Sequence, residues 1–282
     1  MSLLVFGQTG QLARELARRD GVTCLGRAEA DLRDPSACAA AIRAARPEAV
    51  INAAAWTAVD AAEAHEAEAT AINGAAPGAM AAECAALGIP FVTVSTDYVF
   101  DGSGSAPWRP GDVPAPLGAY GRSKLAGELA VAATGGTWAV LRTSWVVSAH
   151  GSNFVKTMLR LGAEREAVRV VADQVGGPTP ARDLADACLT LARTLIAEPE
   201  KGGIHHFAGA PDVSWACFAR ETFALAGIAC AVEDIPSADY PTPAARPLNS
   251  RLDCSDFERV FGVTRPDWRA GLAEILKELG AI

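Results

Sequence analysis

The sequence predicts an α/β protein with a Rossmann-type, doubly wound parallel sheet and a smaller C-terminal α/β lobe. Three observations predict this fold. Short apolar runs alternate with longer helical patterns through the first two thirds of the chain. The first apolar run enters a glycine turn and then a helix, as in a dinucleotide-binding fold. Beyond about residue 175 the pattern loosens into shorter strands, turns and helices.

The length of 282 residues fits one large domain or two small ones. We predict an NAD(P)-binding Rossmann domain in residues 1–150, with residues 151–175 and part of 176–210 completing its sheet. Residues 176–282 are predicted to form the smaller, mostly C-terminal lobe, which would bind substrate over the open ends of the sheet. No internal repeat or low-complexity linker separates the two parts.

The composition argues against several classes of protein. A net charge of −8 and the absence of a Lys/Arg run exclude nucleic acid and membrane surfaces as the main partners. No apolar run approaches the ~20 residues of a membrane span, and no basic leader precedes the first strand, so we expect a cytoplasmic protein. The seven scattered cysteines are typical of buried thiols in a reducing compartment, and the four histidines form no metal pattern, so no metal site is predicted.

The first strand, Leu3–Phe6, runs into a turn with Gly7 and Gly10, and a helix follows to Arg19. In this arrangement the glycines let the backbone approach a pyrophosphate, and the helix N-terminus holds the anion. Glycine spacing is a weak signal by itself, and an ordinary strand-to-helix turn is the alternative. The third position of the motif is Ala13, a residue that helix packing accepts.

The second strand, Val22–Leu25, is followed by Arg27, where a site that prefers NAD often has an acid. An arginine at this point can pair with the 2′-phosphate of NADP, although a solvated arginine remains the alternative. Asp31 and Leu32 come next, placed either at an adenine edge or before the helix that starts near Pro35.

The segment Ala49–Ala55 is almost fully apolar, as expected of a central parallel strand. Its small-residue end, with Trp56 and Thr57, would let a cofactor lie close to the backbone. An Ala-rich helical region follows to about Leu87, with interruptions at Gly74 and Pro77.

The fourth strand, Phe91–Thr96, places Thr96 and Asp97 at its C-terminal end, where ligands bind in open α/β sheets. A Gly/Pro-rich loop over residues 101–118 then leads to a helix that contains Tyr120 and Lys124. A loop of this length inside a compact unit is usually functional. We expect Leu125 and Leu129 of this helix to pack on the sheet.

Tyr120 and Lys124 are spaced i, i+4, so they lie on one face of the helix. A free phenol titrates near ~10, and bringing its pKa to neutrality requires about 4 kcal/mol in favour of the phenolate. One cation at ~4 Å supplies that much only at an effective dielectric constant of ~20, so we expect a partly desolvated cleft. There the phenol would protonate a ketone oxygen as a hydride arrives at carbon, with Thr96 as second hydrogen-bond donor. By itself the Tyr-x-x-x-Lys spacing is weak.

The remaining elements follow from periodicity. We expect a fifth strand that ends near Trp145 and a sixth strand of the sheet, Val168–Ala172, with a turn over residues 173–179. We expect four helices, which are Asn153–Arg165, Asp183–Ala197, Trp215–Ala226 and Asp267–Leu279. The last short strand is expected at Ile204–Ala208, and a Pro-rich passage covers Pro236–Pro247.

The glycine turn, the strand end Ser95-Thr96-Asp97 and Tyr120-x-x-x-Lys124, in this order, resemble an extended short-chain dehydrogenase/reductase. Five further segments resemble the family of dTDP-4-dehydrorhamnose reductases, and together they cover nearly the whole chain. They are Asn52–Asp60, Ser95–Phe100, Arg142–Val146, Asn153–Leu159 and Arg246–Ser250. Five segments in the right order are far more specific than either short motif.

The resemblance implies that Tyr120 is the proton donor, that Lys124 lowers its pKa and holds the nicotinamide ribose, and that Thr96 binds the C4 carbonyl. Asp97 and Trp145 would meet the sugar. The predicted cofactor-binding residues, which include the glycine turn and Arg27 discussed above, are Gly7, Gly10, Gln11, Leu12, Arg27, Asp31, Leu32, Ala55, Trp56, Thr57, Tyr120 and Lys124. Arg246 is a candidate diphosphate or sugar contact because of its place after the Pro-rich passage, and structural pairing is the alternative. The chain departs from the family pattern at Ala13 and Trp56.

The reaction implied is hydride transfer from NADPH or NADH to C4 of dTDP-4-dehydro-β-L-rhamnose, giving dTDP-β-L-rhamnose, the last step of dTDP-rhamnose biosynthesis. Two alternatives remain. One is a related nucleotide-4-keto-6-deoxysugar reductase; the other is a non-catalytic NADP-binding subunit like the regulatory subunit of methionine adenosyltransferase. The sequence leaves open the preferred nicotinamide, a monomer or a homodimer, and whether Mg²⁺ bridges subunits through acids such as Glu274 and Glu278.

Overall fold

A six-stranded parallel sheet forms the centre of the protein. The computed structural model describes all 282 residues. The strand order is β10-β5-β4-β3-β1-β2, and every neighbouring pair is parallel. The strands are β1 (Leu3–Phe6), β2 (Val22–Leu25), β3 (Ala49–Asn52), β4 (Phe91–Thr96), β5 (Trp138–Thr143) and β10 (Gly203–His206). The order reverses at β1, which confirms the predicted Rossmann-type sheet and places a crevice at the carboxyl ends of β1 and β3.

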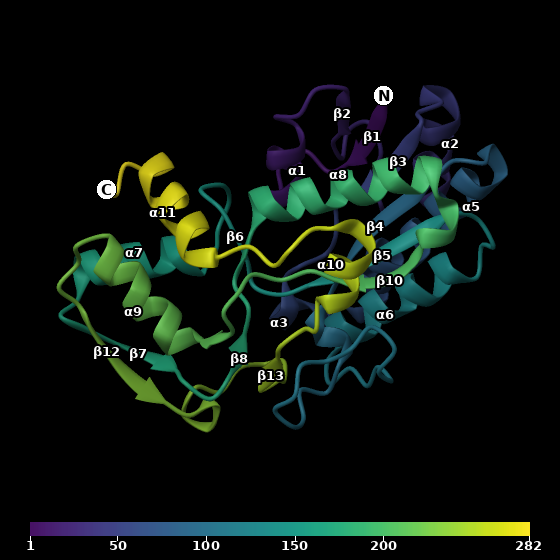
Figure 1. The fold of residues 1–282 in the computed structure, drawn as a ribbon. Helices are drawn as coiled ribbons and strands as arrows, with labels where there is room; N and C mark the ends of the chain where they lie inside the picture. The colour runs from purple at the N-terminus through teal and green to yellow at the C-terminus, as the bar shows by residue number, and fades with distance from the viewer.

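Helices cover both faces of this sheet (Figure 1). Alternate residues of β1 face opposite sides: Leu3 and Val5 pack with α1 (Gln11–Leu16) and α8 (Ala181–Ala197), whereas Leu4 and Phe6 pack with α2 (Pro35–Ala45) and α5 (Ala76–Leu87). Both faces of the sheet are therefore buried, as the continuous apolar runs of the sequence predict. No helix combines the length and the hydrophobicity needed to cross a membrane.

The Ala-rich region before β4 is helical, but its break lies at residues 63–65 and not at Gly74 or Pro77. It consists of α3 (Val59–Ala62), α4 (Glu66–Thr70), a π-helical turn (Ala71–Ala75) and α5. Gly74 lies in the π-helical turn and Pro77 in the first turn of α5, within one continuous helical run.

The helix after the long loop, α6 (Ala119–Ala132), packs differently from our expectation. Leu129 is 64% exposed, and Leu125 packs beside Val99 and Phe100 rather than on the sheet. The buried face of α6 carries small and polar residues instead. A Cβ added to Gly127 would lie 2.1 Å from the carbonyl oxygen of Asn73, so the helix needs glycine to approach the π-helical turn. Hydrophobicity alone therefore indicated the wrong face.

The predicted sixth strand does not join the central sheet. β7 (Ala167–Val171) pairs in parallel with β12 (Ala231–Ile235), and α7 (Phe154–Glu164) and α9 (Trp215–Leu225) pack over this pair (Figure 1). Residues 151–175 therefore do not complete the central sheet; β10 is its sixth strand. An apolar run predicts that a strand exists but does not show which strand it will pair with.

The remaining elements are short. β6 pairs with β9, and β8 pairs with both β11 and β13. These short strands are β6 (Val146–Val147), β8 (Val175–Gly176), β9 (Thr179–Pro180), β11 (Val213–Ser214) and β13 (Asn249–Ser250). The last two helices are α10 (Ser255–Phe261) and α11 (Trp268–Glu278). Three 3₁₀ turns lie at Asp97–Val99, Pro199–Lys201 and Ser237–Asp239. The fifth strand ends at Thr143, before the predicted Trp145, because Trp145 has a φ of 49°.

Candidate active site

The predicted catalytic residues gather where β4 ends and α6 begins. Thr96 is the last residue of β4, and Tyr120 and Lys124 lie on the first two turns of α6. The Thr96 side chain lies close enough to the Tyr120 phenol to lower the pKa of that phenol. The Lys124 ammonium, almost fully buried, donates to the carbonyl oxygen of Val94 in β4 at 2.6 Å. One hydroxyl, one phenol and one ammonium thus converge at the carboxyl end of a central strand.

The pKa values of this group follow from burial. Burial raises the pKa of Tyr120 to about 12; the hydrogen bond with Thr96 opposes this rise, and the charge of Asp97 adds to it. Burial lowers the pKa of Lys124 to about 8. In this structure the Lys124 ammonium is bound to the Val94 carbonyl, and the expectation that it lowers the pKa of Tyr120 remains a prediction.

Asp97 is a buried carboxyl beside the phenol. Its exposed fraction is 2%, and burial raises its pKa to about 6, while the hydroxyls of Ser250 and Thr96 oppose the rise. The Thr96 hydroxyl donates to Asp97 Oδ1 at 3.1 Å, but Oδ2 has no partner. Thr143 is the neighbour of Thr96 on the adjacent strand β5, and its buried hydroxyl also has no hydrogen-bond partner. Unsatisfied buried oxygens at the ends of β4 and β5 indicate a site for a polar ligand.

The glycine turn after β1 has the geometry that a dinucleotide needs. Gly7 has a φ of 118°, and a Cβ there would lie 3.2 Å from Ala13 and 3.4 Å from Ala53. A Cβ on Gly10 would meet nothing within 4 Å, and Gly10 begins α1 without a side-chain cap. The backbone N–H groups of this turn are therefore accessible to a pyrophosphate. Leu12 packs in the core beneath and offers a ligand only its backbone.

The end of β2 carries two arginines. Arg27 is exposed, and Asp31 forms an ion pair of 2.6 Å with Arg33. The hydrogen bonds from Arg33, together with the charges of Arg33 and Arg27, lower the pKa of Asp31 to about 2. Leu32 packs against the core on the α2 side of the sheet. The sequence analysis overlooked Arg33, although its spacing from Asp31 was visible.

The segment after β3 is fixed by Asn73 in the π-helical turn. Asn73 Oδ1 accepts from the Trp56 N–H at 2.8 Å, and its Nδ2 donates to the Trp56 carbonyl at 3.0 Å and to Ser123 Oγ at 2.9 Å. Ser123 in turn donates to the carbonyl of Tyr120. Ala55 and Trp56 are half-buried, whereas Thr57 is exposed. The sequence analysis missed Asn73; a polar residue inside an Ala-rich helix next to Gly74 was the available signal.

Trp145 lies two residues after the end of β5. Its indole stacks on that of Trp215, with ring centroids 3.6 Å apart and planes inclined by 12°. A Cβ on Gly176 would lie 3.1 Å from Trp145 and 2.9 Å from the Cβ of Ser250. Since Ser250 also interacts with Asp97, one serine brings the two predicted sugar-binding residues to the same region. Ser250 belongs to a segment that the sequence analysis quoted without assigning it a role.

Arg246 forms a bidentate pair with Asp60. Nη1 and Nη2 donate to Oδ1 and Oδ2, each at 2.9 Å, and Nη1 also contacts Thr242 Oγ1 and the carbonyl of Ala244. Of the two roles considered for Arg246, the structure shows the structural pairing.

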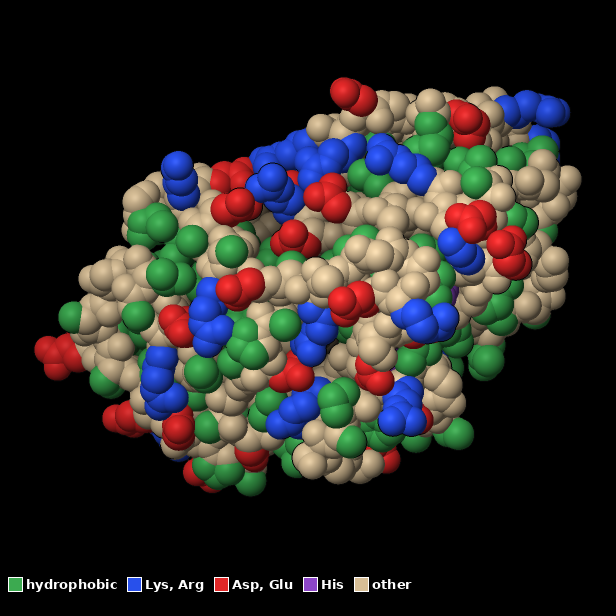
Figure 2. All heavy atoms as spheres, in the orientation of Figure 1, with side chains coloured by type: hydrophobic (Ala, Val, Ile, Leu, Met, Phe, Trp, Pro, Cys, Tyr) green, Lys and Arg blue, Asp and Glu red, His purple; other side chains and the backbone are tan.

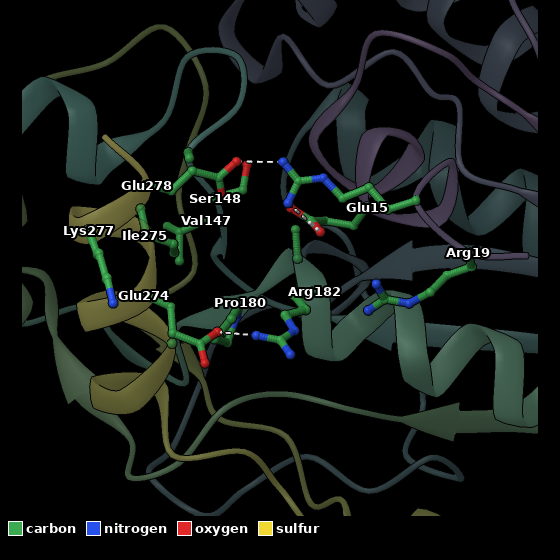
Figure 3. Close-up of a pocket in the computed structure, with 14 residues that line it drawn as sticks. Glu15, Arg19, Val147, Ser148, Pro180, Arg182, Glu274, Ile275, Lys277 and Glu278 are labelled. Carbon is green, nitrogen blue, oxygen red and sulfur yellow. Dashed lines mark hydrogen bonds and ion pairs between the residues drawn. The ribbon is translucent and has the colours of Figure 1, made fainter. Parts of the chain in front are cut away.

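A pocket of about 410 Å³ lies elsewhere, between α1, α8 and α11 (Figure 3), and none of the predicted site residues lines it. Lys and Arg side chains gather over α1 and α8 in Figure 2. Two ion pairs, Arg18 with Glu278 and Arg182 with Glu274, cross the pocket at 2.5 Å each. These pairs neutralise part of the charge on its walls.

A group of possible metal ligands lies at the edge of this pocket. Glu15, His150 and Glu278 offer atoms within 4.8 Å of one another. His150 Nε2 lies 3.1 Å from Glu15 Oε1. Glu278 was named above as an acid that could bridge subunits through Mg²⁺, but its proximity to Glu15 and His150 could not be predicted, because the three residues come from distant segments.

Two features define the class of protein as an extended short-chain dehydrogenase/reductase. The first is a Rossmann-type sheet with a glycine turn after β1, and the second is the group of a threonine, a tyrosine and a lysine at the end of β4. The comparisons with known proteins give the particular family. Over residues 1–281 the chain matches the family described as the RmlD substrate binding domain, and it belongs to this family.

Its relatives carry one name. The chain is 45% identical over 278 residues to the dTDP-4-dehydrorhamnose reductase of Sinorhizobium fredii (strain NBRC 101917 / NGR234), covering 95% of this chain and 94% of the relative. It is 39% identical over 295 residues to the enzyme of that name from Escherichia coli (strain K12), covering 99% and 98%. These matches confirm the resemblance found in the sequence.

Solved structures agree. The dTDP-4-dehydrorhamnose reductase of Clostridium acetobutylicum ATCC 824 superposes with a TM-score of 0.92 at 35% identity, and that of Bacillus anthracis str. Ames, in complex with NADP, with 0.90 at 32%. Each comparison covers 99% of this chain and 100% of the other.

Proposed function

We propose that this chain reduces the C4 ketone of dTDP-4-dehydro-β-L-rhamnose to give dTDP-β-L-rhamnose, the last step of dTDP-rhamnose biosynthesis. The observation that carries the proposal is the pair Thr96 and Tyr120, which lie together where β4 ends and α6 begins, in a chain similar over its whole length to reductases of that name. The same pair argues against a non-catalytic NADP-binding subunit, which has no need of a proton donor.

Thr96 and Tyr120 bind the C4 oxygen from one side. Both hydroxyls donate hydrogen bonds to the ketone, which polarises the carbonyl, and Tyr120 gives its proton to that oxygen as the carbon is reduced. A bound nicotinamide supplies the hydride. One hydride at carbon and one proton at oxygen convert the ketone into the alcohol. The pKa of about 12 keeps Tyr120 protonated before the reaction, as an acid must be.

Lys124, Asp97 and Trp145 position the reactants. Lys124 is one helical turn from Tyr120, and its ammonium would exchange the Val94 carbonyl for the hydroxyls of the nicotinamide ribose. Asp97 has a free Oδ2 that accepts a hydrogen bond from the sugar, and Trp145 offers an indole for its apolar face.

NADPH is the proposed cofactor in preference to NADH. Arg27 and Arg33 place two guanidinium groups at the end of β2, where the adenosine ribose binds in this fold. Asp31, the acid that would repel a 2′-phosphate, is already paired with Arg33. The solved relative from Bacillus anthracis is a complex with NADP, which supports the same choice.

The test follows the loss of absorbance of NADPH or NADH as purified protein meets dTDP-4-dehydro-L-rhamnose. Tyr120→Phe should lower kcat about 10²- to 10⁴-fold, the usual contribution of a general acid, while binding of NADPH persists. Tyr240→Phe, at an exposed tyrosine, is the matched control and should leave kcat unchanged.

Two results would overturn the proposal in different ways. If the wild-type protein binds NADPH but never oxidises it with this ketone, the substrate is wrong, and other nucleotide-4-keto-6-deoxysugars are next to be tried. If Tyr120→Phe retains the full rate, a different residue is the acid.

A further inference from the structure

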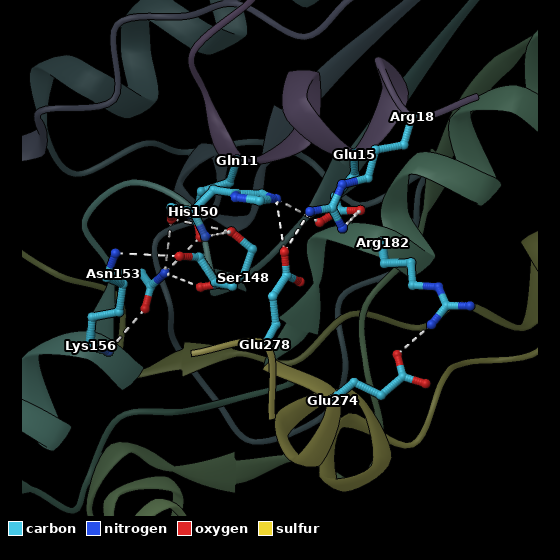
Figure 4. A network of polar contacts seen from close by, with 11 residues as sticks. Gln11, Glu15, Arg18, Ser148, His150, Asn153, Lys156, Arg182, Glu274 and Glu278 are labelled. Atoms are coloured by element: carbon cyan, nitrogen blue, oxygen red, sulfur yellow. Dashed lines mark hydrogen bonds and ion pairs between the residues drawn. The ribbon is translucent and has the colours of Figure 1, made fainter. Parts of the chain in front are cut away.

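The side chain of Gln11 joins the glycine turn to the segment that follows Trp145 (Figure 4). Gln11 lies in the first turn of α1. Its Nε2 donates to the carbonyl of Val146 at 3.1 Å, and its Oε1 accepts from Ser148 Oγ and Asn153 Nδ2, each at 2.9 Å. Three hydrogen bonds to partners more than 130 positions away are unusual for a residue expected only to line a cofactor.

The partners of Gln11 are themselves fixed. Ser148 is 2% exposed, and its hydroxyl accepts from the His150 N–H at 3.0 Å. Asn153 begins α7: its Oδ1 accepts from the Lys156 N–H, and its Nδ2 also donates to the Ser148 carbonyl at 2.7 Å. Gln11 is therefore bound to a rigid turn and not to a free loop end.

The residue before this turn, Trp145, has an uncommon backbone conformation. Its φ of 49° lies in the left-handed region, which bulky side chains rarely adopt unless their surroundings impose it. The Trp145 carbonyl accepts from the Thr179 N–H at 3.1 Å, and its ring stacks on Trp215. The next carbonyl along the chain, that of Val146, is the one that Gln11 binds. The backbone beside Trp145 is thus fixed on both sides.

We infer that Gln11 is a positioning residue: its side chain holds Trp145 in the pose that receives the sugar, and only its backbone serves the cofactor. The kinetic part of this inference rests on the proposed function, in which Trp145 meets the substrate. The conformational part rests on the hydrogen bonds alone.

Four variants separate the contacts. Gln11→Met keeps the length of the side chain and removes all three hydrogen bonds. Gln11→Glu keeps acceptors for Ser148 and Asn153 but cannot donate to Val146. Ser148→Ala removes one bond from the opposite end, at a residue that no prediction places near the cofactor. Arg14→Met, at an exposed position of the same helix, is the matched control.

The first readout is the fluorine NMR spectrum of protein labelled with fluorotryptophan. Six tryptophans give the spectrum, and the resonance of Trp145 is the one that Trp145→Phe removes. Because the indole lies 3.6 Å from that of Trp215, its resonance reports the pose of the ring. The Gln11 variants should displace or broaden this resonance, Ser148→Ala should move it less, and Arg14→Met should leave it in place.

The second readout is binding and kinetics. Gln11→Met and Gln11→Glu should keep the Kd of NADPH within about twofold while the KM of the sugar rises about tenfold, the effect of losing one well-placed contact. The change in kcat should stay within about threefold, because the reacting groups are untouched. A side chain that merely supported the fold would not separate KM from Kd in this way.

Some outcomes would overturn the inference. A Trp145 resonance unchanged in Gln11→Met contradicts it, as does a wild-type spectrum for Gln11→Glu. An increase in the Kd of NADPH with an unchanged resonance would make Gln11 a cofactor ligand instead. If Gln11→Met fails to fold, Ser148→Ala decides by the same resonance. A displaced resonance in a protein that never reduces the ketone would support the positioning role and refute the proposed function.

Discussion

The chemistry of the site is set by the burial of three side chains. Burial raises the pKa of Tyr120 and Asp97 and lowers that of Lys124, so each group is shifted toward its neutral form. This agrees with the desolvated cleft that the Tyr-Lys spacing predicted. The spacing could not predict that the Lys124 ammonium binds a strand carbonyl, because a single sequence does not show which groups meet between elements.

Asp97→Asn should stabilise the protein at neutral pH. The folded pKa of Asp97 is about 6 and its ordinary value is 3.8, so the folded state holds the proton more tightly than the unfolded state. The free energy of unfolding therefore falls as pH rises from about 4 to 6, and the loss above pH 6 is about 3 kcal/mol at 1.36 kcal/mol per unit. The substituted amide has no charge to bury, so the variant escapes this loss.

Urea unfolding of both proteins at several pH values measures the effect. The advantage of Asp97→Asn should be largest at pH 7 and vanish near pH 4. Asp20→Asn, at an exposed position, is the control and should follow the wild type. An advantage that does not depend on pH would contradict the role of the buried charge.

At the scale of elements, the sequence predicted best where strands are apolar on both faces. The bounds of β1 and β2 were predicted to the residue, since apolar runs between glycines and helix patterns leave little freedom. β12 was missed because Ala231–Ile235 contains two acids and four of its five residues are not buried. α10 has only seven residues and no glycine or proline before it, so its pattern was too short to identify.

A buried ion pair joins α6, β5 and the loop before Tyr120. Arg142 donates to Glu128 through Nε at 3.0 Å and Nη2 at 2.6 Å, and both side chains are nearly inaccessible. Nη1 reaches the carbonyl of Pro110, and the guanidinium lies 4.9 Å from the ring centroid of Phe100, which stacks on Trp108. This pair therefore helps to hold the loop that leads into α6.

Removing one partner of the pair should cost more than removing both. Glu128→Gln should lower the free energy of unfolding by about 3–5 kcal/mol, because it leaves the Arg142 charge buried without a counter-ion. The double variant Glu128→Leu/Arg142→Met should lose less than Glu128→Gln, since it leaves no charge in the interior. Chemical denaturation measures both values.

An exposed pair serves as the control for this experiment. Arg160→Met, which breaks the exposed pair with Glu164, should change stability by less than about 0.5 kcal/mol. A double variant less stable than either single variant would mean that the pair itself, and not its uncompensated charge, provides the stability.

At the scale of the whole molecule, side chains from distant parts of the chain meet. Gln11 joins the glycine turn to residues 146–153, and the Asp60–Arg246 pair joins α3 to the C-terminal lobe. A single sequence cannot predict them, because neither local propensity nor hydrophobic period links positions 186 residues apart. The same limit explains why β7 was assigned to the wrong sheet. The domain boundaries at residues 150 and 176 remain a prediction.

Asp60→Ala should loosen the Pro-rich passage near Arg246. Asp60 Oδ1 accepts from the Ala244 N–H at 3.1 Å, and the carboxylate binds both terminal nitrogens of Arg246. Without the Asp60 carboxylate these hydrogen bonds are absent, so the passage opens at a lower cost in free energy. Hydrogen exchange of the Ala244 amide should therefore accelerate at least about tenfold. Hydrogen exchange followed by mass spectrometry measures this, with β4 as the internal reference.

The control for this variant lies in the same passage. Asp239→Ala removes an exposed carboxylate 3.7 Å from Arg169 and should leave the Ala244 amide unaffected. Equal exchange in Asp60→Ala and wild type would show that other contacts hold the passage in place.

The high pKa of Tyr120 has a consequence for the direction of the reaction. At neutral pH, a phenol of pKa about 12 has lost its proton in only about one molecule in 100,000. Ketone reduction begins from the protonated phenol, which is nearly the entire population, whereas alcohol oxidation must begin from the rare phenolate. The structure therefore presents Tyr120 in the state from which ketone reduction starts, and not in the state from which alcohol oxidation starts.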